Sequence, residues 1–274
     1  MSLPVVSVLI PVYNGARFLN TAIQSVLNQT YQNFELILCD NASTDTTPEI
    51  IKSFKDIRIR YHRNARNLGL IPNWNRAFSL AQGKYIKILP ADDVLYPEAL
   101  NTQVKILEND LTEQIALVAS GRHIINESGK VLMTRRLSRR HLNIDGTNAI
   151  NRVIRSGGNG IGEGGSVLFR KSLMEQTGPF NSNIFYVLDL DQWFKFLTRG
   201  RLVYLPEVCA AFRVSSDSAS VQMAEQQRRD YLQFIRLVYR EKSFGLRTSN
   251  YYIGTIKTIL FTQLKKLLYR FVIR

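Results

Sequence analysis

Short apolar runs alternate with stretches of helical periodicity along the first 120 residues. The run from Val5 to Val12 is nearly continuous and rich in β-branched residues, and Phe34–Cys39 is similar. Runs of this kind are typical of buried strands. Between them, apolar residues recur every three or four positions, which predicts an amphipathic helix at Ala16–Gln29.

The same alternation continues along the chain and predicts a fold class. Further strands are expected at Ile57–Tyr61 and Tyr85–Leu89, and further helices at Pro48–Lys55, Asn73–Ala81 and Pro97–Glu108. Strands and helices that alternate at this spacing form βαβ crossovers. We therefore expect an α/β fold in which helices cover both faces of a mostly parallel sheet.

The rest of the chain is less regular. Strands are expected at Ile115–Ala119, Val131–Met133, Ser166–Phe169, Leu202–Leu205 and Val208–Val214, with a helix at Asp191–Thr198 and helical structure from Gln222 onward. Segment 156–165, SGGNGIGEGG, holds six glycines in ten residues, too many for an ordinary helix or strand. It is either a flexible loop or a place where the backbone approaches a ligand.

The chain is basic, and its positive charge is unevenly distributed. The formal net charge is +14, with no excess over residues 1–120, +6 over 121–220 and +8 over 221–274. A nucleic-acid surface, an anionic membrane or a plain solvated surface would each suit such an excess. Because residues 1–120 are neutral overall and hold no known nucleic-acid motif, we expect no nucleic-acid partner.

Other classes of protein are disfavoured by what the sequence lacks. It has no GxxxxGK[ST], and PVYNG at residues 11–15 stands where a dinucleotide fold has GxGxxG. The two cysteines form no CxxC pair, which argues against a disulfide scaffold or a structural zinc site. There is no apolar run of about 18 residues and no charged region at the N-terminus, so neither a spanning helix nor a signal peptide is expected. We therefore expect a cytoplasmic protein.

Polar residues follow the predicted strands at the points where they end. PVYN at 11–14, DNASTD at 40–45 and PADD at 90–93 occupy these positions, and ligands bind outside the carboxyl ends of such strands. The adjacent carboxylates of Asp92 and Asp93 would repel each other unless a cation were bound, and Mg²⁺ or Mn²⁺ prefers oxygen ligands. The alternative is that an aspartate caps the helix Pro97–Glu108.

Over roughly residues 4–220 the chain resembles family 2 glycosyltransferases, which have the GT-A fold. The resemblance is carried, in order, by SVLIPVYN (7–14), SVLNQTYQNFELILCDNASTDTT (25–47), RNLG (66–69), GKYIKILPADDVLYPEAL (83–100), SVLFRKSL (166–173), GPF (178–180) and LDLDQW (188–193). It implies a GT-A domain at 1–220, with a nucleotide-binding half to about residue 120 and an acceptor half at 121–220. A basic helical extension, 221–274, would follow.

The resemblance also implies which residues bind a nucleotide-sugar donor. Pro11 and Tyr13 would line the nucleoside pocket, and Asp40 would bond to the base or lie beside it. Asn67 would lie where the chain passes the nucleoside. Asn41 stands where the family often has a second carboxylate. Because an amide both donates and accepts hydrogen bonds, the choice among UDP-, dTDP- and GDP-sugars stays open.

The same resemblance implies the catalytic groups. Asp92 would reach the ribose and Asp93 the Mn²⁺ or Mg²⁺ ion. In LDLDQW, Asp189 would be the base that takes the proton of the acceptor hydroxyl. Leu188 replaces the family's Glu, which removes a like charge and makes the site drier, with opposite effects on the pKa of the base. Asp191 is the rival candidate, and its other interpretation is a helix cap.

Two residues that follow the LDLDQW motif, Arg213 and Ser215, stand where the family binds the metal or the diphosphate. Ser215 replaces a histidine that often helps to hold the metal or diphosphate in the family. The metal would then depend mainly on Asp93, the donor phosphates and water. Arg213 is expected either to meet a phosphate or to form an ion pair elsewhere.

The C-terminal segment is expected to form a basic amphipathic helix. Its apolar residues repeat at helical spacing: Ile253, Ile256, Leu260, Leu264, Leu267 and Phe271. Such a helix lies in a membrane interface, or packs on its own domain or on a second subunit as a homodimer. Lipid-linked acceptors, common in the family, favour contact with the inner face of a membrane through residues 250–274.

The resulting functional expectation is an inverting glycosyltransferase that moves a sugar to an acceptor hydroxyl. The acceptor would be a saccharide or a lipid-linked molecule, in the synthesis of cell-surface polysaccharide or glycolipid. The alternative is a nucleotide-sugar-binding or nucleic-acid-binding module on the same fold that has lost catalysis.

Overall fold

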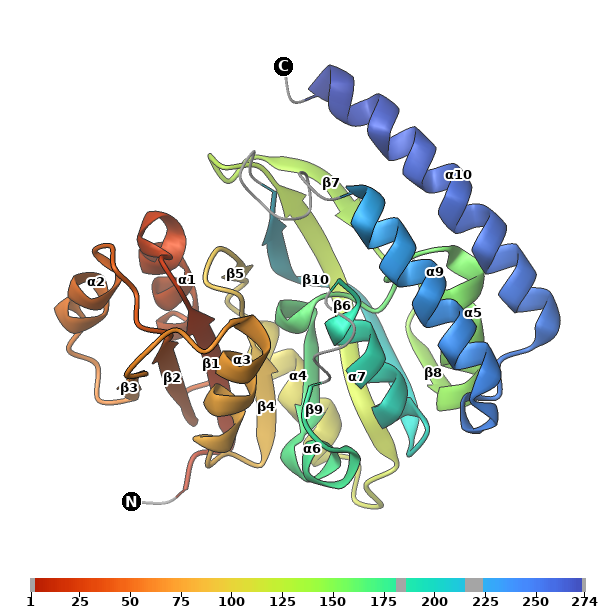
Figure 1. The fold of residues 1–274 in the computed structure, drawn as a ribbon. Helices are drawn as coiled ribbons and strands as arrows, with labels where there is room; N and C mark the ends of the chain where they lie inside the picture. Colours follow the sequence, from red (N-terminus) through yellow and green to blue (C-terminus); the bar gives the residue numbers. More distant parts are fainter. Residues whose placement is uncertain (1–2, 181–185, 215–223, 273–274) are drawn as a thin grey trace.

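One mixed sheet forms the centre of the molecule (Figure 1). The computed structural model describes residues 3–180, 186–214 and 224–272. The ten strands are ordered β3-β2-β1-β4-β9-β6-β10-β5, with β7 paired to β6 and β8 to β10. Their bounds are β1 Val6–Val12, β2 Phe34–Asp40, β3 Ile59–Arg63, β4 Tyr85–Ile88, β5 Val94–Leu95, β6 Ile115–Ile125, β7 Val131–Arg135, β8 Leu142–Asp145, β9 Val167–Arg170 and β10 Arg201–Arg213.

The first half of the sheet is parallel, as the alternation of apolar runs and helices predicts. β1 pairs in parallel with β2 and with β4, and β2 pairs in parallel with β3. Every residue of β1, β2 and β4 is buried, because helices cover both faces. The expected α/β class is therefore confirmed, with a parallel, helix-flanked sheet in the first half of the chain.

The helices separate into two groups that enclose two apolar cores. α1 (Ala16–Leu27), α2 (Thr47–Ser53) and α4 (Ala99–Glu108) pack on one face. The other face is covered by α3 (Leu70–Ser79), α5 (Gly146–Ser156), α6 (Lys171–Thr177), α7 (Leu188–Leu197) and α9 (Ala224–Arg240). Trp193 and Phe194 of α7 are fully buried in this second core.

Pro11 marks the point where the sheet opens. A proline is unusual in a central strand because it has no N–H to donate. The ladder between β1 and β4 ends at the pair Leu9 and Ile88, and its last bond runs from Leu89 N–H to the Leu9 carbonyl over 2.8 Å. Pro11 comes two residues later, where its missing N–H interrupts no bond to β4. β1 and β4 thus separate at their carboxyl ends.

The second half of the sheet is mixed. β9 is antiparallel to β4 and to β6, whereas β10 is parallel to β6. The two strands expected at Leu202–Leu205 and Val208–Val214 are one strand, β10, with an irregular register between Leu205 and Val208. The gap between the two expected strands is therefore a local irregularity of one strand, of the kind that a β-bulge produces.

The C-terminal helix α10 (Thr248–Val272) packs lengthwise on the molecule and leaves one face open (Figure 1). A Cβ at Gly254 would lie 2.3 Å from the Ile154 carbonyl oxygen of α5, so the two helices touch there. One face of α10 thus packs on its own chain, which was one of the alternatives. Of the helices that the structure describes, none combines the length and apolar character needed to span a bilayer.

Candidate active site

The loops that follow β1 and β2 are joined to each other by hydrogen bonds. Asn14 N–H donates to Ser43 Oγ over 3.0 Å, and Asn14 Oδ1 accepts from Thr44 N–H over 2.9 Å. Asp45 Oδ2 accepts from Ala16 N–H over 3.1 Å, which satisfies a donor at the start of α1. The polar residues after the two strands therefore form one rigid rim beside the point where β1 and β4 separate.

Asp40 lies beneath this rim rather than on its surface. It is fully buried, and Oδ1 accepts from Ser43 N–H over 2.8 Å. Oδ2 accepts from the Tyr61 hydroxyl over 2.9 Å and lies 3.5 Å from Arg63 Nε. Both carboxylate oxygens of Asp40 therefore have partners within the protein, and its two expected placements, bonded to a nucleoside base or beside it, stay predictions.

Asn41 is not free to contact a base, contrary to its expected role. Its Nδ2 donates to Asn67 Oδ1 over 2.8 Å and to the Gly69 carbonyl over 3.1 Å. Its Oδ1 accepts from Asn64 Nδ2 over 3.0 Å and from Leu68 N–H over 2.9 Å. All donor and acceptor groups of the buried amide are thus used to hold segment 64–69 against β2.

Two further asparagines in this network were not identified from the sequence. Asn73 Nδ2 donates to the Cys39 carbonyl over 3.0 Å, and its Oδ1 accepts from Asn64 Nδ2 over 2.8 Å. The asparagines at 64, 67 and 73 recur in a short stretch, which is the signal that could have found them.

Pro11 and Tyr13 differ in their exposure to solvent. Pro11 is buried in β1, whereas the Tyr13 side chain is 48% exposed at the end of that strand. Asn67 is exposed as well. Tyr13 and Asn67 are therefore accessible to a ligand, whereas Pro11 is not.

Asp92 and Asp93 lie just beyond the end of β4 and are held by Arg213 of β10. Arg213 N–H donates to Asp93 Oδ1 over 2.9 Å, and Arg213 Nε donates to the Asp92 carbonyl over 2.8 Å. Arg213 Nη1 donates to the carbonyls of Asn126 and Glu127. Nε and Nη1 of this buried guanidinium are thus used by carbonyl groups, and Arg213 forms no salt bridge with any residue in the described parts of the chain. Its contact with a phosphate stays a prediction.

The two aspartates do not cap the helix that follows. The residue before α4 is Glu98, and no side chain caps this helix. Instead both carboxyl groups have a raised pKa: burial is the main cause for each, and the Asp92 charge raises the pKa of Asp93 further. This is the electrostatic condition that a bound cation would relieve.

The donor set fits a divalent cation that is shared with a substrate. Asp93 offers Oδ2 in addition to the bonded Oδ1, and Asp92 is adjacent. No group of three or more His, Cys, Asp or Glu residues suited to a metal occurs in the described parts of the chain. Mg²⁺ is commonly held by one or two carboxylates together with phosphate oxygens and water. Ser215 lies outside the described residues.

Asp189 occupies the first turn of α7 and carries a buried, unbonded oxygen. Its Oδ1 is buried and finds no hydrogen-bond partner among the residues that the structure describes. Burial, aided by the negative charge of Glu163, raises the pKa of Asp189 to about 7. Arg122 and the Gly164 backbone act in the opposite direction. The neighbouring Leu188 is buried in the core, so the site is dry on that side.

Glu163 was not identified from the sequence, although it links the two carboxylate sites. Its carboxylate pairs with Arg122 Nε, and Arg122 Nη2 also donates to the Asn159 carbonyl over 2.8 Å. The charge of Glu163 raises the pKa of both Asp93 and Asp189. Glu163 is the one ionisable residue in the glycine-rich segment 156–165, a signal that could have singled it out.

The end of the glycine-rich segment is fixed by close packing. The Gly162 carbonyl accepts a hydrogen bond from Trp193 Nε1 over 3.0 Å. A Cβ at Gly164 would lie 2.7 Å from the Ile88 carbonyl oxygen at the end of β4. Of the two alternatives, the flexible loop does not hold at this end, because the backbone here is wedged between β4 and α7.

One interpretation of Asp191 was that it caps α7, and this interpretation is wrong. The helix begins at Leu188, so Asp191 lies within its first turn, and the residue before the helix provides no side-chain cap. The carboxylate instead pairs with Lys195 Nζ over 2.7 Å. Asp191 therefore has a salt-bridge partner, whereas Asp189 forms no salt bridge with any residue that the structure describes.

Most of the chain is similar in sequence to known proteins. Residues 7–178 match the model of Glycosyl transferase family 2. An uncharacterized glycosyltransferase of Rickettsia typhi is 30% identical over 232 residues, which are 83% of this chain and 69% of that protein. Another, from Methanocaldococcus jannaschii, is 40% identical over 136 residues, 48% of this chain and 46% of that protein.

Solved structures share the fold. S. aureus TarS 1–349 in complex with UDP-GlcNAc has a TM-score of 0.68 at 15% identity, with 92% of this chain and 71% of that chain covered. The mannosyltransferase PcManGT from Pyrobaculum calidifontis, in complex with GDP-Man and Mn²⁺, has a TM-score of 0.66 at 18% identity, with 93% and 70% covered. These likenesses confirm the GT-A fold, and with the family match they show that the chain belongs to glycosyl transferase family 2.

Proposed function

We propose that the protein transfers a sugar from a nucleoside diphosphate sugar to an acceptor hydroxyl, with inversion at the anomeric carbon and with the help of Mn²⁺ or Mg²⁺. The observation that carries the proposal is the Asp189 carboxyl group, whose Oδ1 atom is buried without a hydrogen-bond partner in the described parts of the chain. Burial and the charge of Glu163 raise the pKa of Asp189 to about 7, and the same charge raises the pKa of Asp93. The bound UDP-GlcNAc of TarS and GDP-Man with Mn²⁺ of PcManGT support this choice of donor and metal.

The donor would lie along the carboxyl ends of β1, β2 and β4. Tyr13 is exposed there and offers a ring face on which a base can stack. Asn67 is accessible beside it, whereas Asp40 and Asn41 support the floor from below. Asp92 would reach the ribose, and Asp93 would hold the cation. When bound, that cation would neutralise charge that develops on the leaving diphosphate.

Asp189 would act as the general base. It takes the proton of the acceptor hydroxyl while the hydroxyl oxygen bonds to C1 and the bond from C1 to the phosphate oxygen breaks on the opposite face. A carboxylate with a pKa near 7 is a stronger base than an ordinary aspartate, and enough of it is ionised at neutral pH. An inactive module would have no need to keep a carboxyl oxygen buried without a hydrogen-bond partner at this place.

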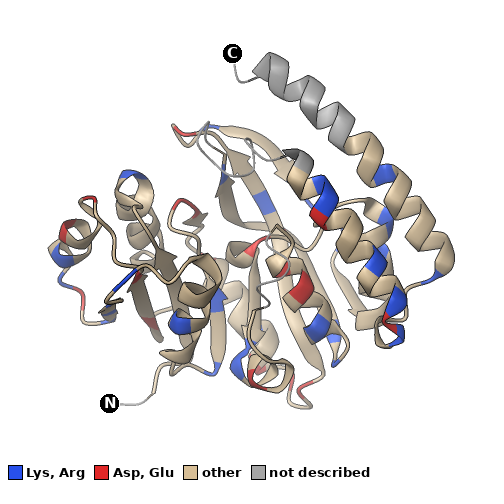
Figure 2. Ribbon diagram, in the orientation of Figure 1, with Lys and Arg blue, Asp and Glu red and all other residues tan. Residues whose placement is uncertain are grey.

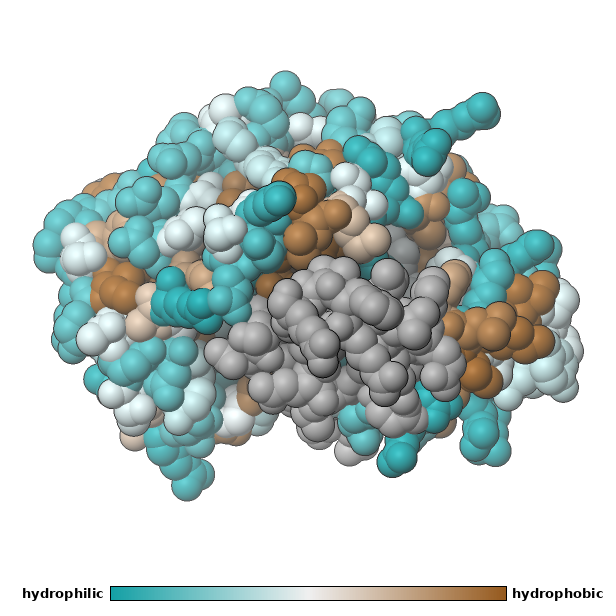
Figure 3. Space-filling view, turned by 90° about the horizontal axis from the view of Figure 1, so that it is seen from above, coloured by the Kyte–Doolittle hydropathy of each residue, from teal (hydrophilic) through white to brown (hydrophobic). Residues whose placement is uncertain are grey.

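The acceptor half and the C-terminal helix suit a large or membrane-bound acceptor in polysaccharide or glycolipid synthesis. Exposed apolar residues of α10 include Tyr252, Ile256 and Leu260. Figure 3 shows hydrophobic residues gathered at the end of the molecule where α10 lies. Figure 2 shows basic residues along α9 and α10. We propose that this face contacts the inner face of an anionic membrane, since apolar area and basic charge act together there.

A donor panel tests the proposed function. UDP-, dTDP- and GDP-sugars are each incubated with Mn²⁺, with Mg²⁺ or with chelator, and release of the nucleoside diphosphate is measured. We expect one donor to be turned over by the wild type in a metal-dependent way and Asp93→Asn to lose this activity. Metal-independent turnover, or donor binding that neither chelator nor Asp93→Asn changes, would contradict the metal role.

A further inference from the structure

The positive charge of the middle of the chain is concentrated in one segment. Residues 129–162 hold seven Lys or Arg and a single acidic residue, whereas the rest of 121–220 holds seven of each. Six of the seven basic residues are arginines: Arg135, Arg136, Arg139, Arg140, Arg152 and Arg155. The acidic residue, Asp145, caps α5 by accepting from Asn148 N–H over 2.9 Å. The net excess of +6 therefore belongs to this segment.

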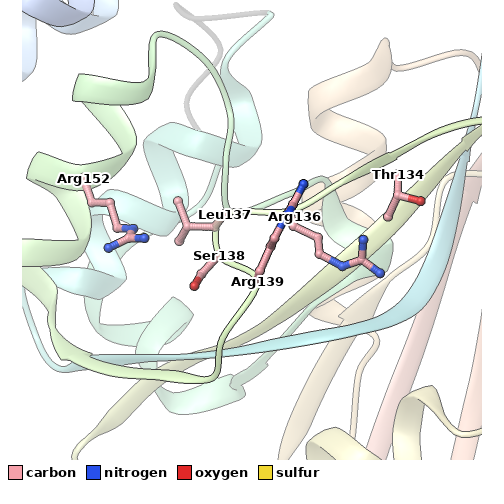
Figure 4. Close-up of a pocket in the computed structure, with 6 residues that line it drawn as sticks. All are labelled: Thr134, Arg136, Leu137, Ser138, Arg139 and Arg152. Carbon is pink, nitrogen blue, oxygen red and sulfur yellow. The ribbon is translucent and has the colours of Figure 1, made fainter.

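The fold gathers half of these arginines around one cavity. The cavity, of about 410 Å³, lies between α5 and the loop that follows β7 (Figure 4). Arg136, Arg139 and Arg152 line it, together with the hydroxyl groups of Thr134 and Ser138. Figure 4 shows Arg152 reaching from α5 toward the loop that carries the other two arginines.

Two of the three guanidinium groups are free to bind a ligand. Arg136 Nε donates to the Pro206 carbonyl over 2.7 Å, which anchors this side chain to β10. The guanidinium groups of Arg139 and Arg152 are exposed and make no hydrogen bond or ion pair with any residue in the described parts of the chain. The planar arginine fork matches the oxygens of a phosphate group, and a lysine-rich surface lacks this geometry.

The cavity is connected to the candidate active site through the glycine-rich segment. The loop after β7, which lines the cavity, is held to β10 because Leu137 N–H donates to the Tyr204 hydroxyl over 2.9 Å. Leu137 packs on Gly160, where an added Cβ would lie 2.8 Å from its Cδ1. Glu163, beside Asp189, follows three residues later, and three residues span at most about 10 Å. An extended substrate can therefore reach both places.

We propose that this cavity binds a phosphate group of the acceptor, as a phosphodiester or a diphosphate, while the acceptor hydroxyl lies at Asp189. The proposal rests on the proposed function, because the acceptor is the second substrate of the transfer. A cavity lined by three arginines and two hydroxyl groups recognises a discrete phosphate group, whereas the exposed apolar face of α10 suits a membrane surface.

A pair of double variants tests the proposal. Arg139→Gln/Arg152→Gln removes the two free guanidinium groups of the cavity. Arg140→Gln/Arg155→Gln removes the same charge from neighbouring exposed positions that do not line it. Inorganic pyrophosphate binding is measured by calorimetry with chelator present, and vesicles that contain phosphatidylglycerol form a second arm. Donor hydrolysis with Mn²⁺ is measured separately.

The cavity variant is expected to bind pyrophosphate about tenfold more weakly than the wild type and the control variant, because charge-assisted hydrogen bonds are lost. Its donor hydrolysis should equal that of the wild type. Equal pyrophosphate affinity of all three proteins, or equal weakening in both variants, would overturn the proposal. So would a loss confined to vesicle binding, which would make the ligand a lipid surface. A wild type that binds pyrophosphate in the cavity but turns over no donor would instead contradict the proposed function.

Discussion

The carboxylate of Glu163, paired with the buried guanidinium of Arg122, lies close enough to Asp189 for its negative charge to raise the pKa of Asp189. Burial is the larger cause, and together they bring this pKa to about 7. The glycine-rich segment is responsible for the arrangement, because Gly164 fits against the end of β4 and places Glu163 beside the start of α7. The strength of the proposed base therefore depends on a residue outside its own motif.

The pH dependence of the reaction is the first consequence. Because Asp189 must be ionised to accept a proton, the rate of transfer should rise with pH up to about 7 and then level off. Glu163→Gln removes a negative charge, so it should lower the pKa of Asp189. The rising part of the pH–rate profile should then move to lower pH. The exposed Glu175→Gln is the matched control and should leave the profile in place. A rising part that does not move in Glu163→Gln would contradict the coupling.

Stability should improve when the base is removed. A carboxyl group whose pKa is raised in the folded state destabilises that state progressively as pH increases from its unfolded pKa near 4 to its folded pKa near 7. Asp189→Asn should therefore stabilise the protein more at pH 8 than at pH 5, by roughly 1–3 kcal/mol in the free energy of unfolding. Urea denaturation at both pH values measures this difference. Asp191→Asn loses the pair with Lys195 and should be destabilised at both. If Asp189→Asn is destabilised at both pH values, the buried ionised carboxylate of Asp189 does not destabilise the folded state, and the prediction is wrong.

Two glycines of the same segment should respond differently to alanine. A Cβ at Gly164 would lie 2.7 Å from a backbone oxygen of Ile88, whereas one at Gly158 would meet nothing within 4 Å. Gly164→Ala should lower the melting temperature and the activity, because β4 and the Glu163 loop must move apart. Gly158→Ala should be nearly neutral. Thermal denaturation and transfer assays compare the two, and equal behaviour would mean that the loop is not wedged as described.

Membrane contact through α10 can be tested without truncation, which would remove the packing of Gly254 on α5. Ile256→Ser/Leu260→Ser changes two exposed residues and should reduce co-sedimentation with anionic vesicles. Ile57→Ser/Leu111→Ser removes two apolar residues elsewhere that are even more exposed, and it should not reduce co-sedimentation. Binding should also weaken as salt increases, because basic residues contribute to it. If the α10 substitutions leave co-sedimentation with anionic vesicles unchanged, the proposed membrane contact is wrong.

Local pattern was sufficient for most of the sheet and for part of the site. The strands Val6–Val12 and Phe34–Asp40 differ from the predicted bounds by one residue at one end, because a continuous apolar run is a property of neighbouring residues. Asp93 and Asp189 could be selected because each stands in a recognisable short motif. The Arg122–Glu163 pair could not, because 41 residues separate its members and it forms only when the glycine-rich segment packs beside β6.

Errors arose where a tertiary contact decided the role of a polar group. Asn41 was expected to face a ligand, but segment 64–69 folds back and uses its whole amide. For Arg213 an ion pair was one of two alternatives, but the guanidinium donates to the carbonyls of Asp92 and Asn126 instead. Asp191 was placed before its helix because the preceding Leu188–Leu190 turn gave no local sign of where α7 begins.

The central claim is tested most directly by the rate of sugar transfer in Asp189→Asn, measured with Mn²⁺ and with the donor that the wild type uses. The substitution keeps the shape of the side chain but removes its ability to accept the proton. We expect the rate to fall by about 10²–10⁴ while donor affinity is unchanged, and Asp191→Asn to retain most of its activity. Near-normal transfer by Asp189→Asn, together with loss of transfer by Asp191→Asn, would contradict the account.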